Sequence, residues 1–413
     1  MPKKMNLLPV VLIAIAVLQC SNNPTAADRV VSRELTASEK LLVESNDRFG
    51  LKLFKEIVKE EEKKNVFISP LSVSMALGMT YNGAAGTTRE AMQKTLELSG
   101  LTIEEVNKSY KSLLELLSQL DPKVRFQIAN SIWYRKGMVF EQEFIDLNKA
   151  YFDALVSELD FDDPEAAETI NGWVDDNTNG KITQIVDPPI DPMMVMFLIN
   201  AIYFKGTWTY EFDKELTKDA DFFLADGSKS RCKMMTREGE FQYFENSDFQ
   251  AIDLPYGDGD FTMIVFLPRR TTDVDSLIAE FSQENWNRWI SSFSEREGTL
   301  ELPRFTLKYE LKLNDVLKAL GMTIAFQPFA ADFSNMYKGP QDLYISEVKH
   351  KTFVEVNEEG TEAAAVTSVG VAITSVDPTV FWMRVDRPFV FAIRENKSQT
   401  LLFMGKIVEP MLE

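Results

Sequence analysis

The sequence contains one almost wholly apolar run, at residues 193–204, that is interrupted only by Asn200. A strand with one face in water alternates apolar and polar side chains, whereas a strand with two covered faces reads as a continuous apolar run. The run therefore predicts a strand in a sheet that has other layers packed against both faces. With 45% hydrophobic residues among 413, the chain can bury the large core that such a sheet needs.

Helical and strand patterns alternate from Ser38 to the end of the chain without a linker or an internal repeat. Ser38 is expected to cap a first helix, and a second helix follows residues 69–72. A hairpin is predicted at residues 251–267, and further strands are predicted at residues 381–393 and 400–408. These patterns indicate a single mixed domain from Ser38 onwards.

The charge balance is strongly acidic, with a formal net charge of −19 from 44 basic and 63 acidic side chains. A chain of this charge is repelled by phosphate backbones and by anionic lipid surfaces. No long stripe of Lys or Arg opposes that conclusion. We therefore expect no nucleic-acid partner and no dense cationic site of the heparin-binding kind.

Cysteine and histidine are scarce, because the chain contains only Cys20, Cys232 and His350. Structural zinc sites use four such ligands, so we expect neither a metal nor another cofactor. A serine-hydrolase mechanism would have to pair His350 with Ser69 or Ser72, and no G-x-S-x-G motif supports it. We therefore predict that the protein is not an enzyme.

The N-terminus has the pattern of a targeting segment, because two lysines precede a short apolar run at residues 7–18. That run is shorter than the roughly 20 residues that a membrane-spanning helix needs. We interpret residues 1–19 as a signal peptide, Cys20 as a lipidated first residue and residues 20–37 as a polar tether. Gln19 stands where a small residue is usual, so a plain signal peptide is the alternative. The protein is expected to be exported, and either secreted or anchored by its lipid at the cell surface or in the periplasm.

Cys232 has no cysteine partner if Cys20 carries a lipid. Its neighbours Arg231 and Lys233 could lower the pKa of the thiol and make it reactive. The simpler interpretation, and the one that we favour, is an unpaired cysteine at the surface or half-buried, without a chemical role.

Residues 363–376 contain neither a charge nor a proline. Read at the period of a strand, small or β-branched side chains share one face: Thr361, Ala363, Ala365, Thr367 and Val369. Such a segment can enter a sheet without burying a charge and without losing a backbone donor to proline. The alternative is a strand that is already buried, but residues 357–360 favour a chain that leaves a strand and turns.

Five stretches resemble the serpin family in their residues, their order and their spacing. They are NVFISPLS at 65–72, NGWV with TNGKI at 171–174 and 178–182, INAIYFKGTW at 199–208, NEEGTEAAA at 357–365, and DRPFVF with FMG at 386–391 and 403–405. The resemblance covers residues 38–413. It implies an α+β serpin fold with three β-sheets, about nine helices and an exposed reactive loop, at about residues 358–378, near the C-terminus.

The resemblance implies a protease inhibitor whose loop acts as bait. In serpins a protease attacks a bond of the loop and forms an acyl-enzyme, and the cut loop then inserts into the large sheet and distorts the tethered protease. By resemblance, the hinge of the loop has the pattern of inhibitory members, which ends in three alanines here: Glu358, Gly360, Thr361, Glu362, Ala363, Ala364 and Ala365. The alternative is a non-inhibitory serpin-fold protein with a binding or storage role.

The reactive bond of inhibitory serpins follows the hinge glycine by about 14 positions, which here predicts the bond Thr374–Ser375. Loop lengths vary, so bonds after Ile373 or Ala372 are alternatives. No Lys, Arg or large aromatic residue lies nearby. Elastase-like and subtilisin-like proteases are therefore the expected targets, and papain-like cysteine proteases are a further class that Ile373 would suit.

By resemblance, Ser69, Ser72, Asn200 and His350 belong to a hydrogen-bonded cluster under the opening of the large sheet, and Trp208 lies beneath the start of the loop. If His350 gates the sheet, its protonation would tune loop insertion near the pH range in which it titrates. An exposed uncharged loop can also insert into a neighbouring molecule. We therefore expect a monomer that can form loop–sheet polymers.

Overall fold

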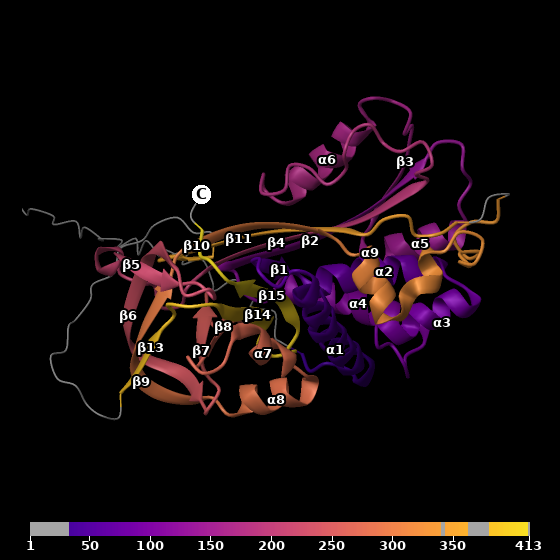
Figure 1. Cartoon of the computed structure of the whole chain (residues 1–413). Coiled ribbons are helices and arrows are strands. Elements are labelled where there is room, and N and C mark those ends of the chain that lie inside the picture. Colours follow the sequence, from indigo (N-terminus) through magenta and orange to yellow (C-terminus); the bar gives the residue numbers. More distant parts are fainter. Residues whose placement is uncertain (1–32, 340–342, 362–379, 412–413) are drawn as a thin grey trace, which may run out of the picture. The chain divides into compact units, whose positions relative to one another are not determined.

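The structure is a computed structural model that describes residues 33–339, 343–361 and 380–411 (Figure 1). The chain divides into two compact units, Met1–Arg33 and Glu34–Glu413, and the description below concerns the second. Within the described residues, no helix combines the length and the apolar character that a membrane span requires.

Nine α-helices occur among the described residues. They are α1 (Ala37–Glu60), α2 (Pro70–Gly83), α3 (Gly86–Thr95), α4 (Ile103–Leu117), α5 (Gln142–Phe152), α6 (Ala166–Asn177), α7 (Val274–Ala279), α8 (Gln283–Ser291) and α9 (Asn314–Leu317). The cap of α1 is Thr36 and not the predicted Ser38. The side chain of Thr36 accepts a hydrogen bond from the backbone of Glu39, whose own side chain accepts one from the backbone of Thr36. This reciprocal pair satisfies two free donors, which Ser38 could not do from inside the first turn.

The first sheet has six strands in the order β10-β11-β12-β4-β2-β3 (Figure 1). Its strands are β2 (Val124–Arg135), β3 (Leu155–Leu159), β4 (Met196–Thr207), β10 (Phe305–Lys312), β11 (Lys349–Asn357) and β12 (Gly360–Thr361). Neighbouring strands are antiparallel except for β2 and β3, which are parallel.

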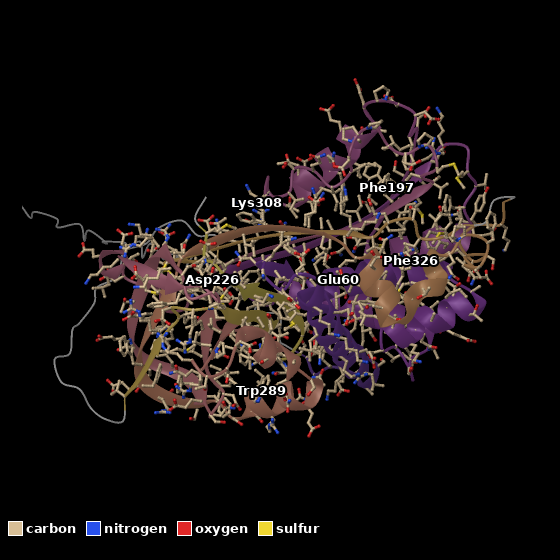
Figure 2. All side chains as sticks on the ribbon, in the orientation of Figure 1. Glu60, Phe197, Asp226, Trp289, Lys308 and Phe326 are labelled. Atoms are coloured by element: carbon tan, nitrogen blue, oxygen red, sulfur yellow. The ribbon has the colours of Figure 1, made fainter. Side chains whose placement is uncertain are left out.

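The apolar run predicted at residues 193–204 forms β4, which begins at Met196. Ile202 belongs to the main hydrophobic core, whereas Ile199 belongs to a second core that includes residues of α6. Phe197 packs against this second core and lies between β4 and α6 (Figure 2). Because odd and even residues of a strand point to opposite faces, β4 has packing on both sides, as its sequence predicts.

The second sheet has nine strands, and eight of them follow the order β1-β15-β14-β8-β7-β6-β9-β13, while β5 pairs with β6. Its strands are β1 (Val66–Ile68), β5 (Lys218–Phe223), β6 (Lys229–Glu245), β7 (Phe249–Tyr256), β8 (Phe261–Pro268), β9 (Ser294–Pro303), β13 (Phe381–Arg384), β14 (Phe389–Glu395) and β15 (Leu401–Ile407). The resemblance implied three sheets. In the described residues the second and third strand sets are continuous, because the long strand β6 pairs with β5, β9 and β7.

The predicted hairpin at residues 251–267 is confirmed as β7 and β8, and the predicted strand at 400–408 is β15. The prediction of one strand at residues 381–393 is wrong, because this stretch forms two strands. β13 runs parallel to β9, whereas β14 lies between β8 and β15. Pro388 lies in the interruption and cannot donate a hydrogen bond to a ladder.

Candidate functional site

The short strand β12 consists of the hinge residues Gly360 and Thr361 and pairs with a strand on each side. Thr361 lies opposite Val356 of β11 and opposite Gly206 of β4. Apart from β12, no ladder among the described residues joins β11 to β4. We call the facing edges of these strands, residues 349–355 of β11 and 196–205 of β4, the seam. The start of the loop thus occupies one end of the seam.

Gly360 holds a position in the sheet that other residues cannot adopt without strain. Its φ is +150°, and a Cβ atom here would lie 2.1 Å from the carbonyl oxygen of Gly206. The preceding turn depends on Asn357, whose side-chain oxygen accepts hydrogen bonds from the backbone N–H groups of Glu359 at 3.0 Å and of Gly360 at 3.3 Å. The chain therefore leaves β11, turns at once and returns to the same sheet.

Two carboxylates in this turn, Glu358 and Glu359, are buried and paired. Glu358 accepts a hydrogen bond from the hydroxyl of Thr217 at 2.7 Å, and Nε of Arg304 lies 3.5 Å from its other oxygen. Glu359 forms an ion pair with Lys214. Burying a carboxylate without a partner costs several kcal/mol. These pairs therefore hold the point where the loop leaves β11.

The side chain of Thr361 is buried beside two stacked aromatic rings. Its hydroxyl oxygen lies 2.6 Å from the hydroxyl of Tyr256. The ring of Trp208 stacks on Tyr256 with 4.4 Å between centroids, and its Nε1 donates a hydrogen bond to the carbonyl of Asn357 at 2.9 Å. Sequence reasoning singled out Trp208 but missed Tyr256, which no motif marks. Burial raises the pKa of Tyr256, so its hydroxyl keeps its proton.

His350 points from the buried face of β11 toward Ser69 and Ser72, which are buried at the start of α2. Nε2 of His350 accepts a hydrogen bond from the backbone N–H of Ser69 at 3.0 Å. The hydroxyl of Ser69 donates to the carbonyl of Leu402 at 2.8 Å, and its oxygen accepts from the backbone of Ser72 at 3.2 Å. The imidazole and the Ser69 hydroxyl are thus not bonded to each other, although a serine nucleophile needs that bond. Within the described residues no His, Cys, Asp and Glu side chains gather into a metal site.

Asn200 lies on the opposite side of the seam from that group. Its amide donates a hydrogen bond to the side-chain oxygen of Asn130 at 2.7 Å, while its own Oδ1 is buried without a partner in the described part of the chain. Asn200 is six residues from Gly206, and His350 is six residues from Val356. Both therefore lie at the same level of the seam. A strand that enters the seam passes between them.

Burial lowers the pKa of His350 to about 4, because the interior disfavours the charged imidazolium. Any effect of His350 protonation on the sheet is therefore expected near pH 4 and not near pH 6.5. Near neutral pH the imidazole is uncharged, as its acceptor role toward Ser69 requires.

Acid is expected to destabilise the fold through His350. The unfolded chain binds this proton at about pH 6.5 and the folded chain only near pH 4, so the stabilising effect is complete above pH 6.5 and is lost as the pH falls toward 4. By pH 5 the loss should reach about 2 kcal/mol. Urea unfolding at pH 7.5 and pH 5 should show a larger loss for the wild type than for His350→Gln. Equal losses would contradict the prediction. The wild type alone does not isolate the effect of His350, because burial also raises the pKa of Asp47 to about 7. That shift makes the fold more stable, not less, as the pH falls.

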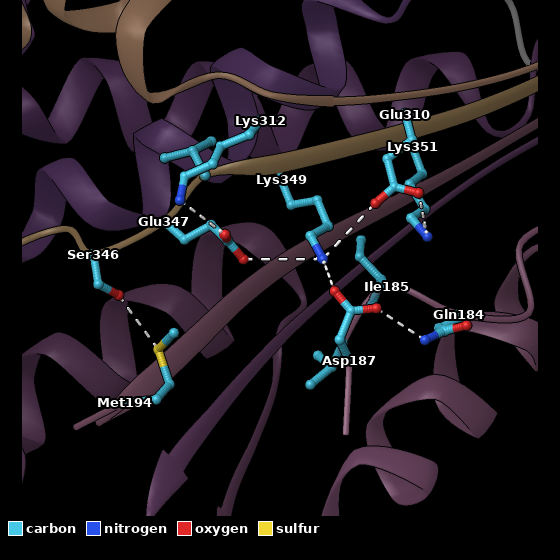
Figure 3. A network of polar contacts seen from close by, with 12 residues as sticks. Gln184, Ile185, Asp187, Met194, Glu310, Lys312, Ser346, Glu347, Lys349 and Lys351 are labelled. Atoms are coloured by element: carbon cyan, nitrogen blue, oxygen red, sulfur yellow. Dashed lines mark hydrogen bonds and ion pairs between the residues drawn. The ribbon is translucent and has the colours of Figure 1, made fainter. Parts of the chain in front are cut away.

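The segment at residues 178–190, which follows α6, contacts β11 through Lys349 (Figure 3). Lys349 directly precedes His350 on the strand, so their side chains point to opposite faces of the sheet. Nζ of Lys349 lies 2.6 Å from the carboxylate of Asp187, and this hydrogen bond holds the pKa of Asp187 below its ordinary range. Farther along, the hydroxyl of Ser346 lies 3.4 Å from the sulfur of Met194 (Figure 3). We call the pairs Asp187–Lys349 and Ser346–Met194 the latch. An inserted strand would separate its two neighbours to roughly 10 Å, so Ser346 and Met194 would have to part.

Cys232 is buried, and its sulfur donates a weak hydrogen bond to the carbonyl of Ala220 at 3.7 Å. Burial raises the pKa of the thiol to about 11, despite Arg231 beside it. Almost no thiolate is present at neutral pH. This environment fits a cysteine without a chemical role, although it is more deeply buried than the sequence suggested.

The remaining predicted site residues lie outside the described residues. They are the hinge residues Glu362, Ala363, Ala364 and Ala365, the reactive-bond candidates Ala372, Ile373, Thr374 and Ser375, and the lipidation candidate Cys20. Their roles stay predictions.

Comparison with known proteins gives a consistent result over most of the chain. The family model "Serpin (serine protease inhibitor)" matches residues 44–410. Iripin-8 of Ixodes ricinus is 36% identical over 387 residues, which cover 91% of this chain and 95% of the relative. Serpin B6 of Macaca fascicularis is 36% identical over 380 residues, which cover 90% of this chain and all of the relative. The crystal structure of tengpin, a thermophilic serpin in its native state, superposes with a TM-score of 0.83 at 31% identity, covering 93% of this chain and 97% of tengpin.

Proposed function

Because this chain belongs to the serpin family, we propose that it traps its target proteases as covalent complexes by inserting its cut loop into the seam. The family and the fold support a protease inhibitor in general. The proposed targets are elastase-like and subtilisin-like serine proteases, with papain-like cysteine proteases as a further class. The uncharged residues around Thr374 support these targets, since a pocket that selects Lys or Arg has nothing there to bind.

In the proposed reaction the nucleophile of the protease attacks the carbonyl carbon of Thr374. The bond to the nitrogen of Ser375 breaks, and that nitrogen leaves with a proton from the general acid of the protease. An ester, or a thioester in a cysteine protease, then links the protease to Thr374. The cut separates the part of the loop that ends at Thr374 from the part that leads to β13. The part that ends at Thr374 stays attached to the sheet through β12.

The register of β12 predicts how the freed chain would continue along the seam. Residues opposite one another in antiparallel strands share a face, and Thr361 shares the buried face with Val356. Continuing that register, Ala363, Ala365, Thr367 and Val369 would face the core, and Glu362 would face outward. Thr367 would pass between Asn200 and His350, since each of these is six residues from the partner of Thr361. Its hydroxyl could there donate to the unpaired Oδ1 of Asn200.

The observation that carries this proposal is the position of β12. Gly360 and Thr361 pair on both sides, with β11 and with β4, at the end of a seam that no described ladder closes. Successive residues that enter would form hydrogen bonds alternately with β11 and with β4, so the inserted strand gains bonds along both edges, which favours insertion once a cut releases the loop. The uncut protein would then be kinetically trapped.

The proposal is tested by mixing the protein with elastase, subtilisin, trypsin and a papain-like protease, followed by denaturing gels and intact mass spectrometry. We expect a covalent complex with at least one of these that survives denaturation, together with a released peptide that begins at Ser375. Cleavage without a complex for every protease would refute trapping. The non-inhibitory alternative, a binding or storage protein, would then replace it.

The latch is expected to slow spontaneous insertion of the uncut loop. Lys349→Ala removes the ion pair with Asp187 together with the longer pairs to Glu310 and Glu347, and partly exposed pairs of this kind contribute about 0.5–1 kcal/mol. Loss of inhibitory activity at a fixed elevated temperature should therefore be about two- to fivefold faster than in the wild type. Lys108→Ala is the matched control, because it breaks the pair with Glu104 on α4, away from the seam. Equal rates in the two variants would argue against the latch.

We also propose that the protein is exported and held at a membrane through a lipid on Cys20. The apolar run at residues 7–18 and the position of Cys20 directly after it support this proposal. Mass spectrometry of the protein from its native membranes tests it. We expect a mature chain that begins at Cys20 and carries the added mass of a diacylglycerol. An unmodified Cys20 would contradict the lipid anchor but not the proposed export.

A further inference from the structure

A cleft of about 640 Å³ lies against the nine-stranded sheet, outside the seam. Its walls come from β5, β6, β7, β13 and the residues that precede β14, and β5, β6 and β13 lie in the same part of the molecule in Figure 1. The backbone N–H of Phe223, at the end of β5, donates to the carbonyl of Asp386 at 2.8 Å. The side-chain amide of Gln250 donates to the carbonyl of Trp382 at 3.1 Å. These bonds join the walls around a space of the size that small organic ligands occupy.

The cleft carries an excess of positive charge, although the whole chain has a net charge of −19. Two guanidinium groups share the single buried carboxylate of Asp386. Nη2 of Arg270 lies 2.8 Å from one of its oxygens, and Nη1 of Arg387 lies 2.9 Å from the other. In the ion pairs at the cleft, six cations thus face four carboxylates: Lys229 and Arg231 with Asp221, Lys233 with Asp219, Arg384 with Glu301, and Arg270 and Arg387 with Asp386.

Arg270 and Arg387 keep donors that the described residues do not use. Arg387 donates through Nε to the carbonyl of Pro268 at 2.9 Å and through Nη1 to Asp386, but no described residue accepts from its Nη2. Arg270 donates only through Nη2 within the same set of residues. Burial lowers the pKa of Arg387, Asp386 partly offsets this, and the charges of Arg270 and Arg269 lower it further. A second anion beside these guanidinium groups would therefore be favourable.

An exposed aromatic ring lines the same cleft. Trp382 is 61% exposed, whereas Phe381 and Met383, its neighbours on the edge strand β13, are buried. Its flat apolar surface therefore faces the solvent that fills the cleft. A ring of this kind beside guanidinium groups suits a ligand that combines a planar apolar body with an anionic group.

We propose that this cleft is a binding site for a small organic anion, whose carboxylate or phosphate group contacts Arg270 and Arg387 and whose planar body packs on Trp382. Asp219 and Asp221 also line the cleft, so it suits a ligand with one anionic group and not a long polyanion. The inference does not depend on protease trapping, because no lining residue belongs to the seam or to the hinge.

The test is isothermal titration of the full mature chain at low salt with four probes. The compounds 2-naphthyl phosphate and 2-naphthoate share a ring and differ in the anionic group, while inorganic phosphate and 2-naphthol each offer only one half of the ligand. At least one of the two naphthyl anions should bind at least about tenfold more tightly than either half. The tighter of the two identifies the anionic group that the site prefers. Its affinity should fall as sodium chloride is added, because salt screens the charges.

Two substitutions in the cleft should each weaken this binding by about tenfold, namely Arg270→Gln and Trp382→Ala. Both side chains are largely exposed, at 63% for Arg270 and 61% for Trp382, so the fold should tolerate their loss. Arg125→Gln is the matched control. The exposed Arg125 also lies over an aromatic ring, 5.5 Å from the centroid of Tyr203, but outside the cleft, and its loss should leave binding unchanged.

Three results would overturn the inference. The first is no binding of either naphthyl anion. The second is equal affinity for inorganic phosphate or for 2-naphthol, which would indicate an adventitious ion only or an apolar surface without selection for charge. The third is unchanged affinity in both Arg270→Gln and Trp382→Ala. None of these results bears on the covalent trapping of proteases, which the gels described above test separately.

Discussion

Thr361→Arg is expected to turn the protein from an inhibitor into a substrate. Thr361 is buried between β11 and β4, with its hydroxyl 2.6 Å from that of Tyr256. In the uncut protein an arginine here could avoid burial only by withdrawing β12 from the seam, and loop insertion would then have to bury its charge, at a cost of several kcal/mol. Insertion would then be slower than hydrolysis of the ester, and active protease would leave. The number of inhibitor molecules consumed per protease should rise from about one to about ten or more.

Glu362→Arg is the control that separates the effect of a charge facing the core from the effect of a charge in the hinge as such. By the register of β12, residue 362 would face away from the core and lie between Lys205 and Glu355. The same charge placed one residue later should therefore leave trapping nearly unchanged, and Thr361→Ser should also preserve it. The quantities to measure are the stoichiometry of inhibition and the yield of covalent complex on denaturing gels. If Thr361→Arg trapped protease as completely as Glu362→Arg, insertion along this register would be disproved.

Thr374→Arg is expected to create a trypsin inhibitor. A trypsin-like pocket contains a buried carboxylate that pairs with a guanidinium, and the wild-type loop offers it no cation between residues 363 and 376. The rate of trypsin inhibition should rise by at least about a hundredfold, because selection by this pocket depends on that one charge. Inhibition of elastase should fall, since the new side chain no longer fits a shallow pocket.

Ile373→Arg and Ala372→Arg test the position of the bond at the same time. Only the variant with arginine directly before the cut bond should trap trypsin, and the mass of the released peptide identifies that bond. Trapping by Ile373→Arg alone would move the bond to Ile373–Thr374. If none of the three variants slowed trypsin, none of these positions would be the reactive bond.

Elements with a strong local pattern were predictable from the sequence. The apolar run at residues 193–204 predicts β4, and the hairpin predicted at residues 251–267 is formed by β7 and β8. The hinge also reads correctly as a turn, because Asn357 and Gly360 are the residues that such a turn needs. Boundaries were less accurate, as the cap of α1 at Thr36 and the two strands within residues 381–393 show. Both depend on contacts rather than on the local pattern.

The sequence by itself determined which faces of each element are apolar, where the chain turns, and that residues 363–376 can enter a sheet without burying a charge. Only the tertiary structure decided what each face meets. It brought Asn200 and His350 to one level of the seam, set Tyr256 against Thr361, and paired Asp187 with Lys349. The members of these pairs are more than a hundred residues apart in the chain. The spacing of apolar residues shows which face of a helix or strand is buried. Which segment covers that face depends on how parts of the chain that are far apart in sequence pack together.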